Sequence, residues 1–258
     1  MIPKFFSVID VETIPNPGLP PECLPQFDES TVKLGNLQDR FKIQAKIDEA
    51  RAAWEIGQDK RCSVDPDLCM VCCGVAMHFQ NVPGEIPNIS CKSAVTAADE
   101  AELLYEIWSC IRAAYEADVP IVGFNTMTFD LPVLVRRAML LDVGVSPAMI
   151  RALLARQESN YRHYDLMQLL GVRSPFSGKI EAKGLSYYLN LFGLGGKTWG
   201  MDGSQVYSLW KEGKINEIKN YCQTDVQRTA SLFRRVAPWL IAPRSHPSTD
   251  NFATVSTR

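Results

Sequence analysis

The sequence predicts one domain of the α/β class, with a mixed β-sheet flanked by helices. Three apolar runs in the first half have the length and composition of strands. The second half is dominated by segments with the apolar repeat of amphipathic helices. No internal repeat and no linker-like stretch divides Phe5 from Leu240, and 258 residues are an ordinary length for a single α/β core.

The first strand is expected over Phe5–Glu12. Five prolines between residues 15 and 25 exclude helix and central strand from the stretch that follows. The segment Asn36–Gln58 is charged, favours helix and has apolar residues at helical spacing. The connection from Thr13 to Asp67 is longer than a simple loop, so we expect it to cover a substrate cleft, bind a partner or pack against the sheet.

Two further strands are expected over Leu68–Phe79 and Glu85–Ser90, joined by a Pro-Gly turn. The segment Ala97–Ala117 has an amphipathic repeat and follows Thr96, whose hydroxyl is a favourable helix N-cap. A short apolar strand is expected over Val119–Phe124. Strands and helices therefore mix in the first half, as the α/β class requires.

The rest of the chain is expected to be mainly helical. Asp130, followed by Pro132, has the pattern of a helix start, because proline is tolerated in the first turn. The last residues, 243–258, are polar and rich in Ser and Thr, so we expect a flexible tail. Helices are expected at Val133–Asp142, Ser146–Gln157, Lys183–Phe192, Ser204–Lys211 and Lys214–Val236.

The composition is that of a soluble globular protein, with 46% hydrophobic and 22% charged residues. No apolar run approaches the length of a membrane span. The opening residues, Met1–Phe6, lack the regions of a secretory signal. We therefore expect a cytoplasmic protein with no membrane partner.

The net charge of −2 does not by itself indicate nucleic-acid binding, but the charge is unevenly distributed. Residues 131–201 carry nine basic and four acidic side chains, a local net charge of +5. A basic wall beside an acidic metal site would suit a phosphate backbone, and ordinary solvated surface charge is the alternative. The basic residues are Arg136, Arg137, Arg151, Arg156, Arg162, Arg173, Lys179, Lys183 and Lys197.

Eight cysteines raise the question of a zinc or iron–sulfur site. Cys69 and Cys72 form one C-x-x-C pair, but no second pair follows at zinc-site spacing. In a buried strand these two side chains face opposite sides, which is wrong for binding one ion. We expect the cysteines to be core thiols.

Carboxylates in three separate contexts carry the chemistry. Asp10 and Glu12 lie two residues apart in the first strand and therefore share a face. Asp130 stands at a helix start, and Tyr221 and Asp225 are helical neighbours at i and i+4. Mg²⁺ prefers oxygen ligands, and two-metal phosphodiester hydrolysis uses carboxylates around paired ions. The pattern indicates a nuclease.

The three contexts, D-x-E, N-x-x-x-F-D and Y-x-x-x-D in this order, resemble the motifs of the DEDD superfamily of 3′–5′ exonucleases, in its tyrosine subgroup. The chain is further similar to the predicted exonucleases related to the proofreading domain of family B DNA polymerases, over about residues 5–236. Stretches that carry the resemblance are Val32–Leu37, Gly123–Leu134, His163–Leu166, Gly195–Lys197, Asp202–Val206 and Tyr221–Val226.

The resemblance implies a ribonuclease-H-like fold and a 3′–5′ exonuclease acting on single-stranded DNA ends. The domain would span residues 1–242, with the segment 13–67 inserted and 243–258 as the tail. Its activity would serve DNA repair, replication or proofreading in trans, with a polymerase or repair partner that the sequence does not identify. A ribonuclease that trims short RNAs and a catalytically silent nucleic-acid-binding module are the alternatives.

Roles for the five site residues follow from two-metal chemistry. Asp10 would bridge two Mg²⁺ or Mn²⁺ ions, Glu12 and Asp225 would complete the first ion, and Asp130 would support the second. Tyr221 would orient the attacking water, because a phenol with a pKa near 10 is a poor free base at neutral pH.

Other residues near the motifs are assigned by adjacency. Thr13, Asn125 and Lys197 are candidate substrate contacts. Asp165 is expected to have a structural role. Phe124, Phe129, Tyr187 and Tyr188 could stack on terminal bases, but burial in the core is the default for all four.

Overall fold

The computed structural model describes residues 3–80, 88–93, 96–155, 162–178, 180–195 and 203–241. Its centre is a five-stranded sheet of order β3-β2-β1-β4-β5, in which β1 pairs antiparallel with β2 and parallel with β4. The expected mixed α/β class is therefore confirmed. The strands are β1 (Phe5–Pro15), β2 (Cys69–Gln80), β3 (Asn88–Ser93), β4 (Ile121–Gly123) and β5 (His163–Asp165).

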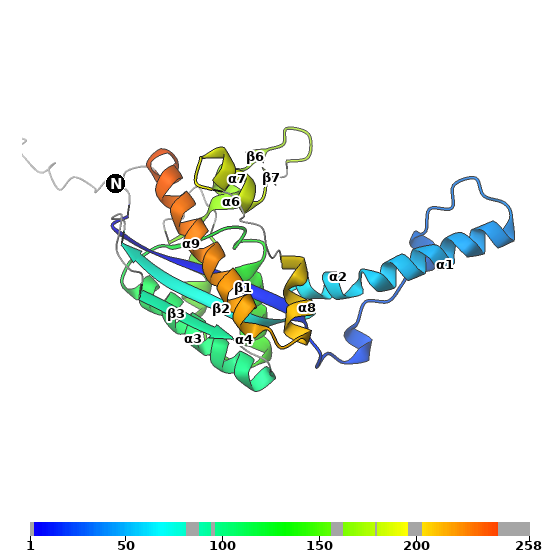
Figure 1. The fold of residues 1–258 in the computed structure, drawn as a ribbon, viewed down its shortest axis with the longest axis horizontal. Coiled ribbons are helices and arrows are strands. Elements are labelled where there is room, and N and C mark those ends of the chain that lie inside the picture. Colours follow the sequence, from blue (N-terminus) through cyan, green and yellow to red (C-terminus); the bar gives the residue numbers. More distant parts are fainter. Residues whose placement is uncertain are drawn as a thin grey trace, which may run out of the picture.

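Helices lie on both faces of this sheet, and α9 crosses one face (Figure 1). A separate antiparallel ribbon joins β6 (Val172–Arg173) and β7 (Ile180–Glu181). The α-helices are α1 (Arg40–Ile56), α2 (Gln58–Val64), α3 (Ala97–Glu116), α4 (Asp130–Leu140), α5 (Pro147–Leu153), α6 (Leu166–Leu170), α7 (Leu185–Leu191), α8 (Val206–Lys211) and α9 (Ile215–Leu240).

Each face of the sheet is covered by its own hydrophobic cluster. One contains Phe6 and Val8 of β1 together with the apolar stripe of α9, including Phe233. The other contains Ile9 and Val11 of β1 with buried residues of α3 and α4. Because strand side chains alternate, Asp10 and Glu12 belong to the face that α9 covers.

A bulge in β2 interrupts the alternation opposite Glu12. The β1–β2 register pairs Glu12 with Cys73 but Thr13 with Val71, so Cys72 is the extra residue. Cys72 and Cys73 consequently both join the cluster on the α9 side, whereas Cys69 joins the other cluster. The prediction that Cys69 and Cys72 face opposite sides agrees with these positions, and both thiols are buried and free of disulfides.

Several expected element bounds were wrong. β1 runs on to Pro15, so Asp10 and Glu12 lie inside the strand rather than at its end. β4 is reduced to Ile121–Gly123, and β3 begins at Asn88, with 81–87 outside the described residues. α4 begins at Asp130 itself, and Thr96 caps α3 as expected by accepting the Asp99 N–H at 3.2 Å.

The helix ends also differ from the prediction. The expected helix from Asn36 to Gln58 is two helices that meet at Gly57. α5 ends at Leu153, and α7 covers only Leu185–Leu191. α9 continues past the expected end to Leu240 and includes Pro238. The proline is tolerated because the one backbone hydrogen bond that it removes lies in the last turn of the helix.

Several short elements were missed, among them the strand β5, the helix α6 that follows it, the helix α2 and the two-residue strands β6 and β7. The three residues of β5 and the five of α6 are too short to show a periodicity. The predicted tail, 243–258, lies outside the described residues.

The segment between β1 and β2 forms an arm that projects from the body (Figure 1). The helix α1 has no buried residue along its 17 positions. Trp54 packs inside the arm, edge-on to Phe27 at 6.0 Å and under the Arg61 guanidinium at 4.6 Å, rather than against the sheet. Of the alternatives expected for this segment, packing against the sheet applies to α2, whose Ser63 carbonyl accepts the Thr13 hydroxyl, and not to Trp54.

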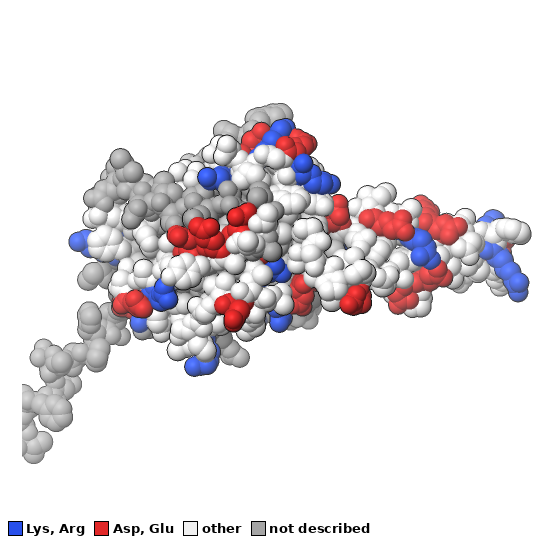
Figure 2. Space-filling model, turned by 90° about the horizontal axis from the view of Figure 1, so that it is seen from below, with Lys and Arg blue, Asp and Glu red and all other residues white. Residues whose placement is uncertain are grey.

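The described part of the basic segment 131–201 does not form a single positive wall. Arg137 is buried in an ion pair with Glu100, Arg136 pairs with Asp67, and Arg162 pairs with Asp118. On the face shown in Figure 2 the described basic side chains are scattered, and a contiguous group of acidic side chains lies in the middle of the body. None of the helices that the structure describes has both the length and the apolar character needed to cross a membrane.

Candidate active site

Asp10 and Glu12 project from the middle of β1 toward α9. A carboxylate oxygen of each and the Cys222 Sγ all lie within 4.8 Å of one another. Glu12 is 9% exposed, and Asp10 is more accessible. The β2 bulge lies directly opposite Glu12, where a bulge changes the direction of neighbouring side chains. The local strand geometry thus gathers two acids and a thiol in one place.

The helix α9 contributes the next two candidates. Tyr221 and Asp225 lie one turn apart, and their side chains are hydrogen-bonded to each other. The buried side of the helix is apolar and fixes its rotation, with Cys222 and Val226 fully buried. Asp225 also pairs with Arg228 at 3.3 Å. The apolar stripe therefore determines that Tyr221, Cys222 and Asp225 meet the acids of β1.

Asp130 reaches the cluster from the first residue of α4. Its Oδ1 accepts the Val11 N–H at 3.0 Å, and Asp130 is 2% exposed. Val11 lies beyond the last β1–β4 pair, which joins Val8 to Val122. The Asp130 carboxylate thus takes the hydrogen bond that a longer β4 would have taken, directly between Asp10 and Glu12 in sequence.

The loop from β4 to Asp130 is held by Asp165. The Asp165 carboxylate accepts the Asn125 N–H at 2.9 Å and the Met127 N–H at 2.8 Å, and it also caps α6. Asn125 has a φ of 69°, a left-handed conformation that asparagine tolerates better than most residues. These contacts fit the structural role that the sequence predicts for Asp165.

A buried histidine supports the same loop. Thr126 Oγ1 and His163 Nε2 are 2.7 Å apart, and His163 Nδ1 lies 3.0 Å from the Leu153 carbonyl. Gly123 allows this approach, since a Cβ there would lie 2.0 Å from the Thr126 side chain. The residue before the loop must therefore be glycine for Thr126 to reach His163.

Burial and the neighbouring acids of the cluster raise the pKa values of Asp10 and Glu12. Desolvation, followed by the charges of Asp130 and Asp225, raises the pKa of Asp10 well above its usual range. Desolvation and then Asp10 do the same to the pKa of Glu12. Burial raises the pKa of Asp130 to about 7. The four carboxylates therefore form one coupled electrostatic group.

The pKa of the Tyr221 phenol is raised far above its usual value, first by burial and then by the charge of Glu12. The hydroxyl keeps its proton over the whole range in which proteins usually work. Tyr221 can consequently donate a hydrogen bond, and it cannot serve as a free base.

The donor set of the cluster fits a hard divalent cation. Carboxylate oxygens are the ligands that Mg²⁺ and Mn²⁺ prefer. Within the described residues, no Lys, Arg or His forms an ion pair with Asp10 or Glu12. Holding the charged forms of both acids close together and away from water is unfavourable. A bound cation offsets this electrostatic repulsion and desolvation. Asp10, Glu12, Asp130 and Asp225 are the residues that could hold it.

The three candidate substrate contacts have different positions. Thr13 is 7% exposed, and its hydroxyl donates to the Ser63 carbonyl of α2, on the sheet face opposite Glu12. That side chain is engaged in the fold and points away from the acids. Asn125 lies on the loop before Asp130 and is partly exposed, and its side-chain oxygen accepts from Thr128. Lys197 lies outside the described residues.

The four candidate stacking aromatics do not share one environment. Tyr188 is buried, and Phe124 and Phe129 are partly buried, close to the default expectation. Tyr187 is 51% exposed, so the expectation of burial was wrong for this residue. It stands edge-on to Tyr188 at 5.5 Å, which leaves one side of its ring to solvent.

Cys222 was missed as part of the site. All cysteines were expected to be core thiols, which is wrong for the exposed Cys23, whereas Cys222 is fully buried. However, its Sγ lies 3.2 Å from Asp10 Oδ2 and donates to that carboxylate. Its place directly after Tyr221, on the inner side of an amphipathic helix, was the only available signal.

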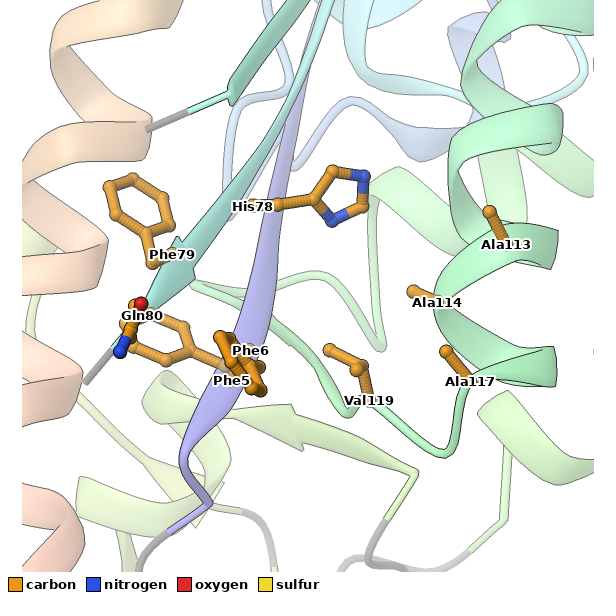
Figure 3. A pocket seen from close by; sticks show the side chains of 9 residues that line it. All are labelled: Phe5, Phe6, His78, Phe79, Gln80, Ala113, Ala114, Ala117 and Val119. Atoms are coloured by element: carbon orange, nitrogen blue, oxygen red, sulfur yellow. The ribbon is translucent and has the colours of Figure 1, made fainter. Parts of the chain in front are cut away.

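An apolar pocket of about 400 Å³ opens at the other end of β1 (Figure 3). It lies near Phe5, five residues or roughly 17 Å along the strand from Asp10. The one titratable side chain of its lining is His78, whose Nδ1 is 2.6 Å from Ser7 Oγ. The pocket is therefore separate from the acid cluster. It is lined by Phe5, Phe6, His78, Phe79, Gln80, Ala113, Ala114, Ala117 and Val119.

Comparison with protein families agrees with this geometry. Residues 68–239, more than half of the chain, match the family described as predicted 3′–5′ exonucleases related to the exonuclease domain of PolB. The chain belongs to this family. No match was found among curated proteins.

The matched region of this exonuclease family contains Asp130, Tyr221 and Asp225 but begins after Asp10 and Glu12. The β1–β2 pairing brings those two acids to the rest of the cluster. The match also begins after the projecting arm.

The fold is that of a polymerase exonuclease domain. A family B DNA polymerase from the hyperthermophilic archaeon Pyrobaculum calidifontis is similar to this chain, with a TM-score of 0.53 and 18% identity. The likeness covers 92% of this chain and 25% of the polymerase chain. This exonuclease-family member therefore has a ribonuclease-H-like mixed α/β fold, and it spans a quarter of the polymerase.

Proposed function

We propose that this chain is a metal-dependent 3′–5′ exonuclease that removes nucleotides from the 3′ ends of single-stranded DNA. One observation carries the proposal. Asp10 and Glu12 lie beside Asp130 and Asp225, and the pKa values of Asp10 and Glu12 are strongly raised. Among the described residues, no basic side chain forms an ion pair with Asp10 or Glu12. Such a group is stable only when it is protonated or binds cations. Membership of the exonuclease family supports the reaction class.

Two Mg²⁺ or Mn²⁺ ions bound here would activate a water molecule and stabilise the leaving 3′-oxygen. Asp10, which is coupled to both Asp130 and Asp225, would contact both ions. Glu12 and Asp225 would hold one of them. Asp130 would support the other while keeping its hydrogen bond to Val11.

Tyr221 would orient the attacking water. Its hydroxyl is hydrogen-bonded to Asp225, and its raised pKa keeps the proton on the phenol. A positioned donor contributes by fixing the direction of attack rather than by accepting a proton. Asn125, on the loop between β4 and Asp130, is the proposed contact to the terminal nucleotide.

The domain assignment and the partners belong to the same proposal. Residues 1–242 would form the exonuclease domain, with 13–67 as an insertion and 243–258 as a tail. The activity would serve repair, replication or proofreading in trans beside a separate polymerase. The preference for DNA rests on the family resemblance.

The experiment compares 5′-labelled single-stranded DNA and RNA of one sequence, incubated with Mg²⁺, Mn²⁺ or EDTA. The wild type and Asp10→Asn are tested beside Asp142→Asn, the same chemical change at an exposed acid away from the cluster. Asp142 has a φ of 54°, which asparagine tolerates, so this control keeps its backbone.

A one-nucleotide DNA ladder that requires metal, is lost in Asp10→Asn and persists in Asp142→Asn supports the proposal. Faster shortening of RNA would make the protein an exoribonuclease instead. If the protein bound both polymers tightly but shortened neither under any metal condition, the exonuclease proposal would be rejected. The protein would then be a nucleic-acid-binding module.

A further inference from the structure

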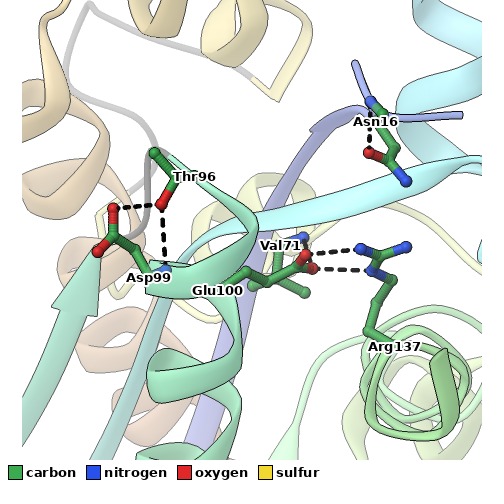
Figure 4. A network of polar contacts seen from close by, with 7 residues as sticks. Asn16, Val71, Thr96, Asp99, Glu100 and Arg137 are labelled. Atoms are coloured by element: carbon green, nitrogen blue, oxygen red, sulfur yellow. Dashed lines mark hydrogen bonds and ion pairs between the residues drawn. The ribbon is translucent and has the colours of Figure 1, made fainter. Parts of the chain in front are cut away.

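Glu100 and Arg137 form an ion pair on the sheet face opposite the carboxylates. Arg137 donates to Glu100 through Nε at 2.8 Å and through a terminal nitrogen at 2.6 Å (Figure 4). The two residues are 0% and 3% exposed. A two-pronged pair of this kind fixes orientation as well as distance. It joins α3, which carries Glu100, to α4, which carries Arg137.

Glu100 also holds the strand β2. Its Oε1 accepts the Val71 N–H at 2.7 Å. The last β2–β3 pair joins Cys73 to Ser93, so Val71 lies beyond the reach of β3. Glu100 therefore takes the hydrogen bond that a longer β3 would have taken. Val71 is the residue next to the bulge at Cys72, and the bulge is opposite Glu12.

Asp130 plays the corresponding role for β1, on the edge of β1 that pairs with β4. It accepts the Val11 N–H beyond the end of β4, and it lies seven residues, or two helical turns, before Arg137 on α4. The contacts close a ring: Glu100 to Val71, β2 to β1, Val11 to Asp130, and α4 back to Arg137. Asp130 is a member of this ring, and Glu12 lies opposite the bulge that adjoins Val71.

We propose that Glu100 and Arg137 are positioning residues, which set Glu12 through the β2 bulge and Asp130 through α4. This inference rests on the proposed function only where it concerns catalysis. If the pair served stability alone, its loss would lower the melting temperature without changing the properties of the folded site. If it positions the acids, the cation affinity of the folded protein falls as well, as when supporting partners of metal ligands are removed.

Three variants separate these cases. Glu100→Gln removes the charge that faces Arg137. Glu100→Gln/Arg137→Met removes both charges, so that no buried cation is left unpaired if the single variant fails to fold. Ile111→Ala opens a cavity about three turns further along α3, at a fully buried position that takes no part in the hydrogen bonds of the ring, and controls for lost stability.

Mn²⁺ affinity is measured by titration calorimetry well below each melting temperature, beside kcat and KM on single-stranded DNA. We expect both Glu100 variants to lose about tenfold or more in Mn²⁺ affinity, with kcat reduced similarly and KM within about twofold. Ile111→Ala is expected to melt earlier and keep the wild-type Mn²⁺ affinity.

Wild-type Mn²⁺ affinity in both Glu100 variants would overturn the proposal, as would an equal loss in Ile111→Ala. A wild type that binds Mn²⁺ but never shortens DNA would reject the proposed exonuclease function. The affinity comparison would still decide whether the pair positions the acids, so the two failures are distinguishable.

Discussion

Cys222 Sγ donates a hydrogen bond to Asp10 Oδ2 at 3.2 Å, between residues 212 positions apart in the chain. The thiol is fully buried and also lies 3.4 Å from the Asp10 carbonyl. This contact favours the charged form of Asp10, and it attaches α9 to the middle of β1.

Replacing Cys222 with alanine is expected to weaken cation binding. A lost hydrogen bond to a buried acid costs about 1 kcal/mol, which corresponds to roughly fivefold in Mn²⁺ affinity. Cys222→Ser keeps a donor and should stay closer to the wild type. Calorimetric titration measures both, with Cys62→Ala as a buried thiol outside the site. Equal affinities in all four proteins would show that the contact has no effect on the site.

Neutralising Asp10 is expected to stabilise the metal-free protein. Raised pKa values mean that the folded state binds more protons than the unfolded state, so the stability falls as pH rises through the folded-state pKa values. Asp10→Asn removes one charge of that group. In EDTA at pH 8 it should melt about 2–4 °C higher for each 1 kcal/mol relieved. Mn²⁺ should stabilise the wild type far more than the variant, and a lower melting temperature of Asp10→Asn in EDTA contradicts the electrostatic account.

Tyr221→Phe is expected to reduce kcat by about 10²-fold with little change in KM, because it removes a donor and leaves the ring in place. The raised pKa of the phenol also predicts that Tyr221 causes no change in the wild-type rate between pH 7 and 10. Single-turnover rates across that range measure both effects. If the variant retained full activity, the water-orienting role would be wrong.

His163 makes the folded protein sensitive to acid. Burial lowers the pKa of His163 to about 4, whereas an unfolded histidine titrates near 6.5. The neutral His163 ring therefore contributes fully to the free energy of unfolding above pH 6.5. This contribution, about 3 kcal/mol in total, is lost as the pH falls toward 4. Urea unfolding at several pH values should show a shallower loss for His163→Gln, whose amide does not titrate. The acid cluster is common to both proteins, so its opposite pH dependence cancels in the difference. Parallel curves would contradict the prediction.

The parts of the site that the sequence predicted are those with a local pattern. Asp10 and Glu12 share a face because they are two residues apart in a strand, and Tyr221 and Asp225 meet because they are four apart in a helix. The mixed α/β class followed from the same periodicities. These features depend on neighbours in the chain, which a sequence displays directly.

The contacts that join distant segments were not predictable. The Asp130–Val11 hydrogen bond connects residues 119 positions apart, and the bulge at Cys72 appears only once β1 and β2 are paired. The sequence left the packing of Trp54 open, since an aromatic residue on a helix also fits packing against the sheet. Trp54 contacts Phe27 edge-on and lies under the Arg61 guanidinium within the arm itself.

The most direct test of the account is whether Asp10, Glu12, Asp130 and Asp225 bind divalent cations. Crystals soaked with Mn²⁺ and a single-stranded phosphorothioate oligonucleotide, measured at the manganese edge, give the positions of bound ions by anomalous scattering. The account predicts two manganese peaks at these carboxylates, with Asp10 next to both. Density for the oligonucleotide with no manganese peak at Asp10 would contradict it.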